Sequence, residues 1–212
     1  HVDAIQSAGK VPVDVRALDA DSLTLSAHKL GGPQGVGALV FKEGVSGVRI
    51  LHGAGQERGL RAGTENVPGI AGFGVAADCA ARDLEAMQSH VAWRDAAEAR
   101  VKAAGATIIG GAADRLPNTL FMAVEGWDSP QQLITLDLTG VMVSAGSACS
   151  SGKVKPSKTI GAMGLNALAT GGVRASGGWS TIESDWSRFA DAWIAAYDKH
   201  KARAAARVRE VA

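Results

Sequence analysis

The segment that most constrains the fold is a strand-like stretch that ends in a lysine and a glycine-rich loop. Ser22–Ser26 alternates polar and leucine side chains, and His28 and Lys29 follow it almost directly. The loop 31–37 carries four glycines, and the apolar run Ala38–Phe41 after it indicates a second strand. Because α/β sheets gather functional groups where their strands end, this arrangement predicts an α/β fold with Lys29 at a sheet edge.

A further strand is expected at the start of the chain and a long helix in its middle. His1–Ala4 is strand-like, and Gln6–Ala20 would cross over as a helix or a loop. From Pro68 onward, apolar residues recur at spacings of three and four, which places them on one helical face. They are Ile70, Phe73, Ala77, Ala80, Leu84, Met87 and Val91.

The second half has the pattern of a smaller α+β unit. Thr107–Ile109 and Thr119–Val124 indicate strands. Ser129–Gln132 offers an N-cap serine, a proline and a capping-box glutamine for a helix that continues through Leu138.

A terminal helix is expected to open with a capping box at Ser180–Glu183. Aromatic and aliphatic residues share one face of it, which indicates core packing and not a ligand site. They are Ile182, Trp186, Phe189, Trp193 and Tyr197. Basic residues near its end suit the helix dipole and predict a solvated face. They are Lys199, Lys201, Arg203, Arg207 and Arg209.

Composition restricts the class of protein. Lys and Arg total 22 and Asp and Glu total 21, so the net charge of +1 gives no strong field for nucleic acid or an anionic membrane. Hydrophobic residues at 46% and charged residues at 20% describe a folded globular chain. Glycine, with 27 of 212 residues, is about twice as frequent as its usual ~7% and predicts functional loops.

Two cysteines are too few for a disulfide scaffold, and no apolar run approaches the roughly 20 residues of a membrane span. We therefore expect a soluble protein of a reducing compartment, the cytoplasm. The chain opens on His1, without a methionine and within a strand-like segment, so we expect it to be a fragment of a longer protein.

Lys29 is either an ordinary surface lysine or an amine that forms a Schiff base. A lysine that is partly desolvated near other positive groups has a lowered pKa and can attack an aldehyde as the neutral amine. Ser26 and His28 beside it could hold a phosphate. Asp3 could keep a pyridine nitrogen protonated, as a pyridoxal cofactor requires, and Gln6 could donate to the phenolic oxygen of the ring.

Cys149 lies in a small, polar segment, Val143–Lys153, which is a poor place for a core cysteine. Nearby lysines could lower the pKa of its thiol and make it a nucleophile. Zinc is a competing use, but no Cys-x-x-Cys pattern accompanies it. Cys79, inside the expected long helix, is instead predicted to be packing.

Two other residues have a structural and a functional interpretation. Thr64 stands near the expected start of the long helix, where it could bind a phosphate or simply cap the helix. Arg174, in a short strand-like stretch, could hold a carboxylate through two hydrogen bonds or form a structural ion pair.

Four segments together resemble the cysteine desulfurases of the nitrogen-fixation and iron–sulfur-cluster type. These enzymes belong to the class V aminotransferase family of fold type I pyridoxal-phosphate enzymes. The segments that carry the resemblance are His1–Gln6, Leu25–Pro33, Gln56–Pro68 and Gly146–Gly152. Their order and spacing agree with the family over nearly the whole chain.

The resemblance implies a role for each candidate residue around pyridoxal 5′-phosphate. Lys29 would carry the cofactor. Asp3, which is expected to be buried, would pair with the pyridine nitrogen and Gln6 would contact the ring oxygen. Ser26 and His28 would bind the phosphate, and Thr64 would reach the phosphate of the neighbouring subunit in a homodimer.

The resemblance also implies the reaction. Arg174 would hold the carboxylate of the substrate, L-cysteine, and Cys149 would accept its sulfur as a persulfide while L-alanine leaves. The persulfide would pass to an iron–sulfur scaffold or another acceptor protein, and Cys149 could help hold a nascent [2Fe-2S] cluster as a metal ligand.

The family also sets the expected domains. Residues 1–85 would be the C-terminal part of a cofactor-binding large domain, and residues 86–212 a small α+β domain with the cysteine loop. Relatives carry an upstream segment with further cofactor contacts, so we expect this chain alone to bind the cofactor weakly or not at all. The alternatives are another class V enzyme, such as a selenocysteine lyase or an aminotransferase-like relative, and a non-catalytic module that docks partners.

Overall fold

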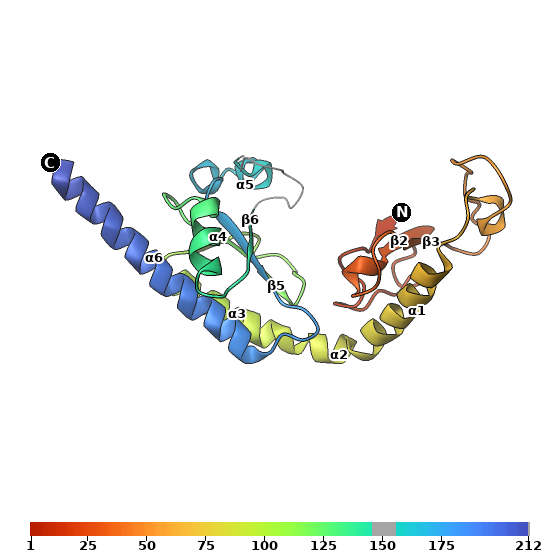
Figure 1. The fold of residues 1–212 in the computed structure, drawn as a ribbon, viewed down its shortest axis with the longest axis horizontal. Helices are drawn as coiled ribbons and strands as arrows, with labels where there is room; N and C mark the ends of the chain where they lie inside the picture. The colour runs from red at the N-terminus through yellow and green to blue at the C-terminus, as the bar shows by residue number, and fades with distance from the viewer. Residues whose placement is uncertain (146–155, 212) are drawn as a thin grey trace. The chain divides into compact units, whose positions relative to one another are not determined.

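The structure, a computed structural model, describes residues 1–145 and 156–211 (Figure 1). It divides into two compact units, His1–Gln88 (unit 1) and Ser89–Ala212 (unit 2). No helix among the described residues is long and apolar enough to cross a membrane.

Unit 1 is built on a three-stranded sheet in the order β1-β2-β3. Its strands are β1 (Val2–Asp3), β2 (Ser22–Ser26) and β3 (Gly37–Phe41), close to the three predicted ranges. β1 runs parallel to β2, and β3 runs antiparallel to β2. The crossover 6–20 is a series of turns and contains no helix.

The prediction of one long helix is wrong. The chain forms α1 (Val67–Arg82), α2 (Leu84–Met87) and, in unit 2, α3 (Ser89–Ala103). Two short 3₁₀ turns, η1 (Ala27–Lys29) and η2 (Glu57–Gly59), complete unit 1.

The buried face of α1 also differs from the prediction. Gly69 and Ala76 are its buried residues, whereas the predicted Ile70 is 45% exposed. The spacing of large apolar side chains predicts a different face, because this helix packs through small residues. A Cβ on Gly72 would lie 2.7 Å from Cγ of Pro33, so the loop approaches too closely for a larger residue.

Unit 2 contains a four-stranded antiparallel sheet in the order β4-β5-β7-β6. The strands are β4 (Thr107–Ile108), β5 (Thr119–Ala123), β6 (Ser144–Ala145) and β7 (Gly172–Ser176). Besides α3, its helices are α4 (Ser129–Asp137), α5 (Lys158–Ala162), η3 (Asn166–Leu168) and α6 (Glu183–Val211).

The sheet of unit 2 has an apolar core on each face, because successive strand residues point to opposite sides. Leu120 and Met122 of β5 join the core formed with α3, α4 and α6. Phe121 and Ala123 face the smaller core with Ile160 of α5. The predicted core face of the last helix is confirmed for Trp186, Phe189 and Trp193, which are buried. The prediction is wrong for Ile182, which is 58% exposed.

The predicted caps of α4 and α6 are replaced by other contacts. Ser129 is buried and donates to the carbonyls of Thr170 and Gly172, at 2.6 and 2.8 Å, and does not cap α4. At α6 the Asp185 carboxylate accepts from the N–H of Ile182, at 3.0 Å, so the capping box does not use Ser180.

Gln132 likewise does not act as a capping residue. It is buried and donates to the carbonyls of Trp127 and Gly171, while its side-chain oxygen accepts from the Trp193 indole. Ser129 and Gln132 thus link the start of α4 to the chain at the start of β7, and Gln132 also links it to α6. Their donors satisfy backbone carbonyls that would otherwise be buried without a partner.

Candidate functional site

The candidate site of unit 1 lies where β1 and β2 end. In the register of this parallel pair Asp3 lies opposite Thr24, two residues before the end of β2 at Ser26. Parallel neighbours present their carboxyl ends at the same edge of a sheet. The topology therefore brings Asp3 and the segment from Ser26 to Lys29 to one edge, as the sequence predicts.

Beyond β2 the chain turns at once into η1, which contains His28 and Lys29. The side chains of Ser26 and His28 are joined, with Oγ and Nδ1 2.8 Å apart. Both His28 and Lys29 are exposed. The pair thus forms a polar group that immediately precedes Lys29 in the chain.

Lys10 is a neighbour of Lys29 that the sequence analysis missed. Partial burial lowers the pKa of Lys10, and the positive charge of Lys29 lowers it further. The Lys10 ammonium donates to the carbonyl of Gln6, 2.8 Å away. A second positive charge therefore lies near Lys29, which is itself exposed. Only the turns of the crossover bring Lys10 there, so no local pattern reveals it.

Glycines hold the loop after Lys29 against α1. A Cβ on Gly32 would lie 3.1 Å from Cβ of Ala76, and one on Gly69 would lie 2.9 Å from Cγ1 of Val36. The loop therefore packs on the helix with its backbone. This packing fixes the direction in which the chain leaves Lys29.

Asp3 and Gln6 are exposed, which corrects the expectation of a buried Asp3. The reason is that β1 is the edge strand of the sheet among the described residues, so nothing covers its outer side. One carboxylate oxygen of Asp3 accepts the N–H of Ile5, at 3.0 Å. The carboxylate keeps one oxygen and its exposed surface for another partner.

Thr64 is exposed and does not cap α1. The cap is Asn66, whose side-chain oxygen accepts the N–H of Gly69 at 3.1 Å. The preceding loop is held by its own contacts, including an Arg61–Glu57 ion pair of 3.2 Å. The capping interpretation of Thr64 is thus wrong, and its role toward a phosphate stays a prediction.

Of the residues predicted in unit 2, Arg174 is described and Cys149 lies outside the described residues. Arg174 is an exposed residue of β7, opposite Phe121 of β5 and Ser144 of β6. Within the described part of the chain it takes part in no ion pair, so the structural ion-pair interpretation finds no partner there. Cys79, in unit 1, is half-buried, and its Sγ accepts a hydrogen bond from Nη2 of Arg82, 3.0 Å away.

The chain resembles one known protein family over most of its length. Residues 1–189 match the aminotransferase class-V family. The chain belongs to that family. It is 40% identical over 195 residues to a cysteine desulfurase of Gluconacetobacter diazotrophicus and 43% identical over 175 residues to one of Rhodobacter capsulatus.

These alignments cover 90% and 82% of the chain but 49% and 46% of the two relatives. A NifS-like protein from Rickettsia africae has the same fold, with a TM-score of 0.81 at 30% identity over 92% of the chain and 52% of its own length. The chain therefore spans about half the length of the relatives that it matches. The fold is that of the NifS-like branch of fold type I, which confirms the predicted fold class.

Class-V family membership implies pyridoxal 5′-phosphate as the cofactor. The side chains at the shared edge of β1 and β2 suit pyridoxal 5′-phosphate. They offer a lysine amine for an aldehyde, a hydroxyl and an imidazole for a phosphate, and a carboxylate for a pyridinium nitrogen.

Proposed function

We propose that this chain supplies the lysine-bearing half of a pyridoxal-phosphate-dependent cysteine desulfurase. The observation that supports the proposal is the topology of β1 and β2, which brings Asp3 and the segment from Ser26 to Lys29 to one edge of the sheet. Identity of 40% to 43% to proteins named cysteine desulfurase supports the reaction class. A complete site needs the half of the relatives' length that the alignments leave uncovered.

Four residues would hold the cofactor. Lys29 is the amine that its aldehyde would join, and the Ser26–His28 pair would bind its phosphate. Asp3 would keep its ring nitrogen protonated. When bound, the cofactor would supply an electron sink for the pair of electrons left on the substrate α-carbon.

The residues of the chain would divide the remaining work. Arg174 would grip the carboxylate of L-cysteine, and Lys29 would take the α-proton and move it. The Cys149 thiolate would attack the substrate sulfur, so that an S–S bond forms as the carbon–sulfur bond breaks. The electron pair of that bond stays on carbon, which takes a proton and becomes the methyl group of L-alanine, leaving a persulfide on Cys149.

Further parts of the proposal concern assembly and sulfur delivery. The active form would be a homodimer in which Thr64 contacts the phosphate of the other subunit. The persulfide would pass to an iron–sulfur scaffold or another acceptor, and Cys149 would serve as a ligand of a transient [2Fe-2S] cluster. The reaction belongs in a reducing compartment, the cytoplasm, because it needs the free thiolate of Cys149.

The test is an absorbance titration with pyridoxal 5′-phosphate, followed by borohydride reduction and mass spectrometry. We expect a visible band and a reduced adduct on Lys29, and Lys29→Ala should abolish both. Lys42→Ala is the control, because Lys42 is an exposed lysine paired with Asp19 at 2.7 Å.

If the chain alone gives no band, the titration is repeated with the remaining half of a relative supplied as a second chain. An adduct on any lysine other than Lys29, or no adduct even then, would show that the proposed role of Lys29 is wrong. Release of sulfide from L-cysteine, measured in the same mixture, tests the reaction class separately.

A further inference from the structure

The loop 177–182, which joins β7 to α6, contacts a buried histidine of α3. His90 is 3% exposed, and its Nδ1 accepts a hydrogen bond from the indole N–H of Trp186, 3.2 Å away. The ring also makes a hydrogen bond to the backbone of Gly178. Because Nδ1 accepts, the neutral ring carries its proton on Nε2. His90 therefore connects α3, α6 and the loop between β7 and α6.

The ring fits closely against the first residue of the loop. A Cβ on Gly177 would lie 2.6 Å from Cε1 and 2.7 Å from Nδ1 of His90, so only a glycine leaves room for the ring. The N–H of Gly177 donates to the carbonyl of Asn118 at 2.9 Å, which fixes this end of the loop to the sheet. On another side the ring lies beside Trp93, with ring centroids 5.0 Å apart. The ring therefore has little freedom to move within its site.

The outer part of the loop is held less firmly. The carbonyl of Gly178 accepts the N–H of Thr181 at 3.0 Å, and the N–H of Gly178 donates to the Thr181 hydroxyl at 2.9 Å. Both of these bonds lie within the loop, and residues 178–180 are exposed, with Trp179 at 78%. Among the hydrogen bonds between described residues, the bond to His90 therefore ties Gly178 to another element.

Protonation of His90 would set two hydrogen-bond donors against each other. A proton on Nδ1 would face the indole N–H of Trp186, which can only donate. Trp186 is 3% exposed and belongs to the main core of unit 2, so it cannot easily move away. The exposed part of the loop is the neighbour that can yield. Burial lowers the pKa of His90, so the neutral ring and its bonds are complete at neutral pH.

Charged residues on the elements packed against the ring have other partners or lie in solvent. Arg94, one turn further along α3, pairs with Asp95 at 2.7 Å. In the first turn of α6, Glu183 is exposed and the carboxylate of Asp185 accepts a backbone N–H at 3.0 Å. None of these charges is a cause of the lowered pKa of His90, which burial sets against one backbone hydrogen bond. His90 is therefore the group whose titration acts on this contact.

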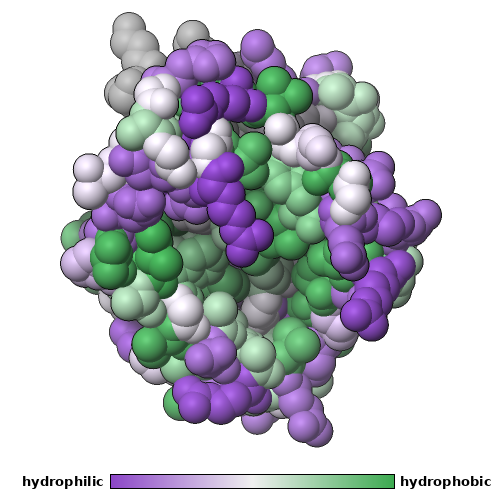
Figure 2. All heavy atoms as spheres, turned by 90° about the vertical axis from the view of Figure 1, so that its right-hand side faces the viewer, coloured by the Kyte–Doolittle hydropathy of each residue, from purple (hydrophilic) through white to green (hydrophobic). Residues whose placement is uncertain are grey.

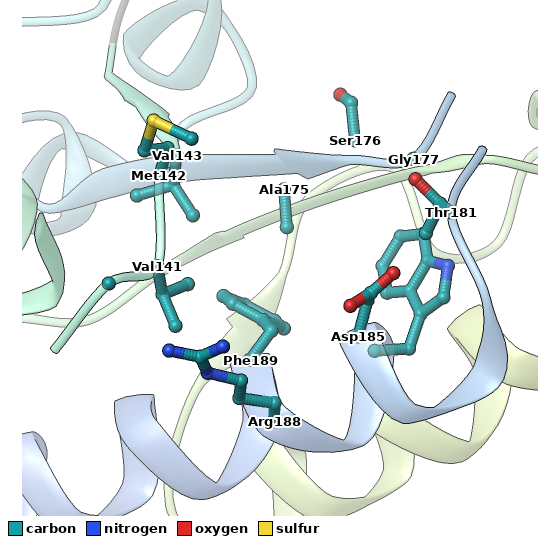
Figure 3. A pocket seen from close by; sticks show the side chains of 12 residues that line it. Val141, Met142, Val143, Ala175, Ser176, Gly177, Thr181, Asp185, Arg188 and Phe189 are labelled. Atoms are coloured by element: carbon teal, nitrogen blue, oxygen red, sulfur yellow. The ribbon is translucent and has the colours of Figure 1, made fainter. Parts of the chain in front are cut away.

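We propose that protonation of His90 is a pH-sensitive switch that releases the loop 177–182. The neutral ring holds the loop against α3, and the protonated ring frees residues 178–182 while the rest of unit 2 stays folded. The loop borders a pocket of about 260 Å³, whose lining includes Gly177, Thr181 and Trp186 (Figure 3). Release of the loop at mildly acidic pH would open that side of the pocket to solvent.

The test follows the backbone and indole N–H signals of the isotope-labelled 212-residue chain by NMR between pH 7.5 and pH 5.5. We expect the signals of Gly178 and of the Trp186 indole to shift together on one titration curve, with a midpoint below the usual 6.5 of histidine. The Trp193 indole is the internal control. It is also buried in α6, but it donates to the side chain of Gln132 at 3.0 Å, which does not titrate, so its signal should not follow the curve.

Three variants complete the test. His90→Gln has no titrating ring and should abolish the shared shift. Trp186→Phe removes the opposing donor, so the ring can be protonated in place and the Gly178 signal should move less. His200→Gln is the matched control, because the ring of His200 contacts the carbonyl of Gly126 at 3.0 Å and its loss should leave the Gly178 response unchanged.

The proposal would be overturned by a Gly178 signal that does not respond to pH, or that responds equally in His90→Gln or Trp186→Phe and in the unchanged chain. A change of the Trp193 signal along the same curve would also overturn it, because unit 2 would then open as a whole and not at the loop. None of these readouts depends on cofactor binding or sulfur transfer.

Discussion

The two units differ in how they bury their hydrophobic residues. Unit 2 encloses large side chains almost completely, among them Trp193, Leu120 and Leu136, all at 0% exposure. Four of the six buried hydrophobic residues of unit 1 are alanines. Its large apolar residues include Val48 at 86% and Ile50 at 82% exposure. Figure 2 shows hydrophobic residues exposed among polar ones on one face of the molecule.

This difference predicts which unit of the chain is the more stable. Unit 2 has a core of large apolar side chains, whereas unit 1, which carries Lys29, buries mostly alanine and leaves more of its large apolar residues exposed. We therefore expect unit 1, which carries the candidate cofactor site, to be the less stable unit of a chain that spans about half of its relatives' length. The following predictions test this contrast.

The largest effect is expected from Trp193→Ala in unit 2. Removing this fully buried indole leaves a cavity and takes a donor from Gln132, so we expect a loss of about 3 to 5 kcal/mol in the free energy of unfolding. All five tryptophans lie in unit 2, so urea unfolding followed by tryptophan fluorescence reports on that unit. Trp179→Ala, at a 78% exposed position, should change stability by less than about 0.5 kcal/mol.

Replacing two glycines of α1 with alanine, one at a time, should change the stability of unit 1 in opposite directions. Gly72→Ala would push a Cβ to 2.7 Å from the rigid ring of Pro33, which should cost about 1 to 3 kcal/mol and loosen the loop after Lys29. Gly74→Ala meets no atom within 4 Å and should stabilise the helix by up to about 1 kcal/mol. Hydrogen exchange of the α1 amides measures both, and equal effects would contradict the packing described for this helix.

A smaller effect concerns acid stability of unit 2. Burial lowers the pKa of His90, and its hydrogen bond to the Gly178 backbone opposes this only in part. The unfolded chain therefore binds a proton more readily, so stability is complete above about pH 6.5 and is lost as the pH falls toward the lowered pKa. The neutral ring accepts the indole N–H of Trp186 at 3.2 Å, and a proton on that nitrogen would break the bond.

The measurement for His90 is the urea midpoint of tryptophan fluorescence at pH 7.5 and pH 5.5. We expect the midpoint to fall at pH 5.5 and to fall less in His90→Gln, which has no titrating ring. An equal fall in both proteins would assign the acid sensitivity to other groups.

The smallest effect on stability is expected at the apolar surface of unit 1. Replacing both Val48 and Ile50 with serine should leave the unfolding of unit 2 within about 0.5 kcal/mol. It should nevertheless reduce aggregation and the binding of a hydrophobic dye, because these two side chains are exposed apolar surface. Leu138→Ser, at an 83% exposed position of unit 2, should reduce dye binding less than the double substitution in unit 1. An equal reduction would contradict the contrast between the units.

The sequence by itself determined the elements whose patterns are local. Ser22–Ser26 matches the observed β2, and the strand prediction at Thr119–Val124 matches β5 to within one residue. The aromatic face of the last helix and the position of Lys29 just after a strand could also be predicted from the sequence. Both depend on the spacing and type of residues that are close together in the chain.

Tertiary structure decided the features that depend on contacts between distant segments. It broke the expected long helix, packed α1 through glycine and alanine, and turned Ser129 away from capping toward carbonyls 41 and 43 residues away. It also placed Lys10 beside Lys29 and left Asp3 on an open sheet edge. Burial and electrostatic neighbours are set by which segments meet in space, and that information lies in the packing and not in any local pattern.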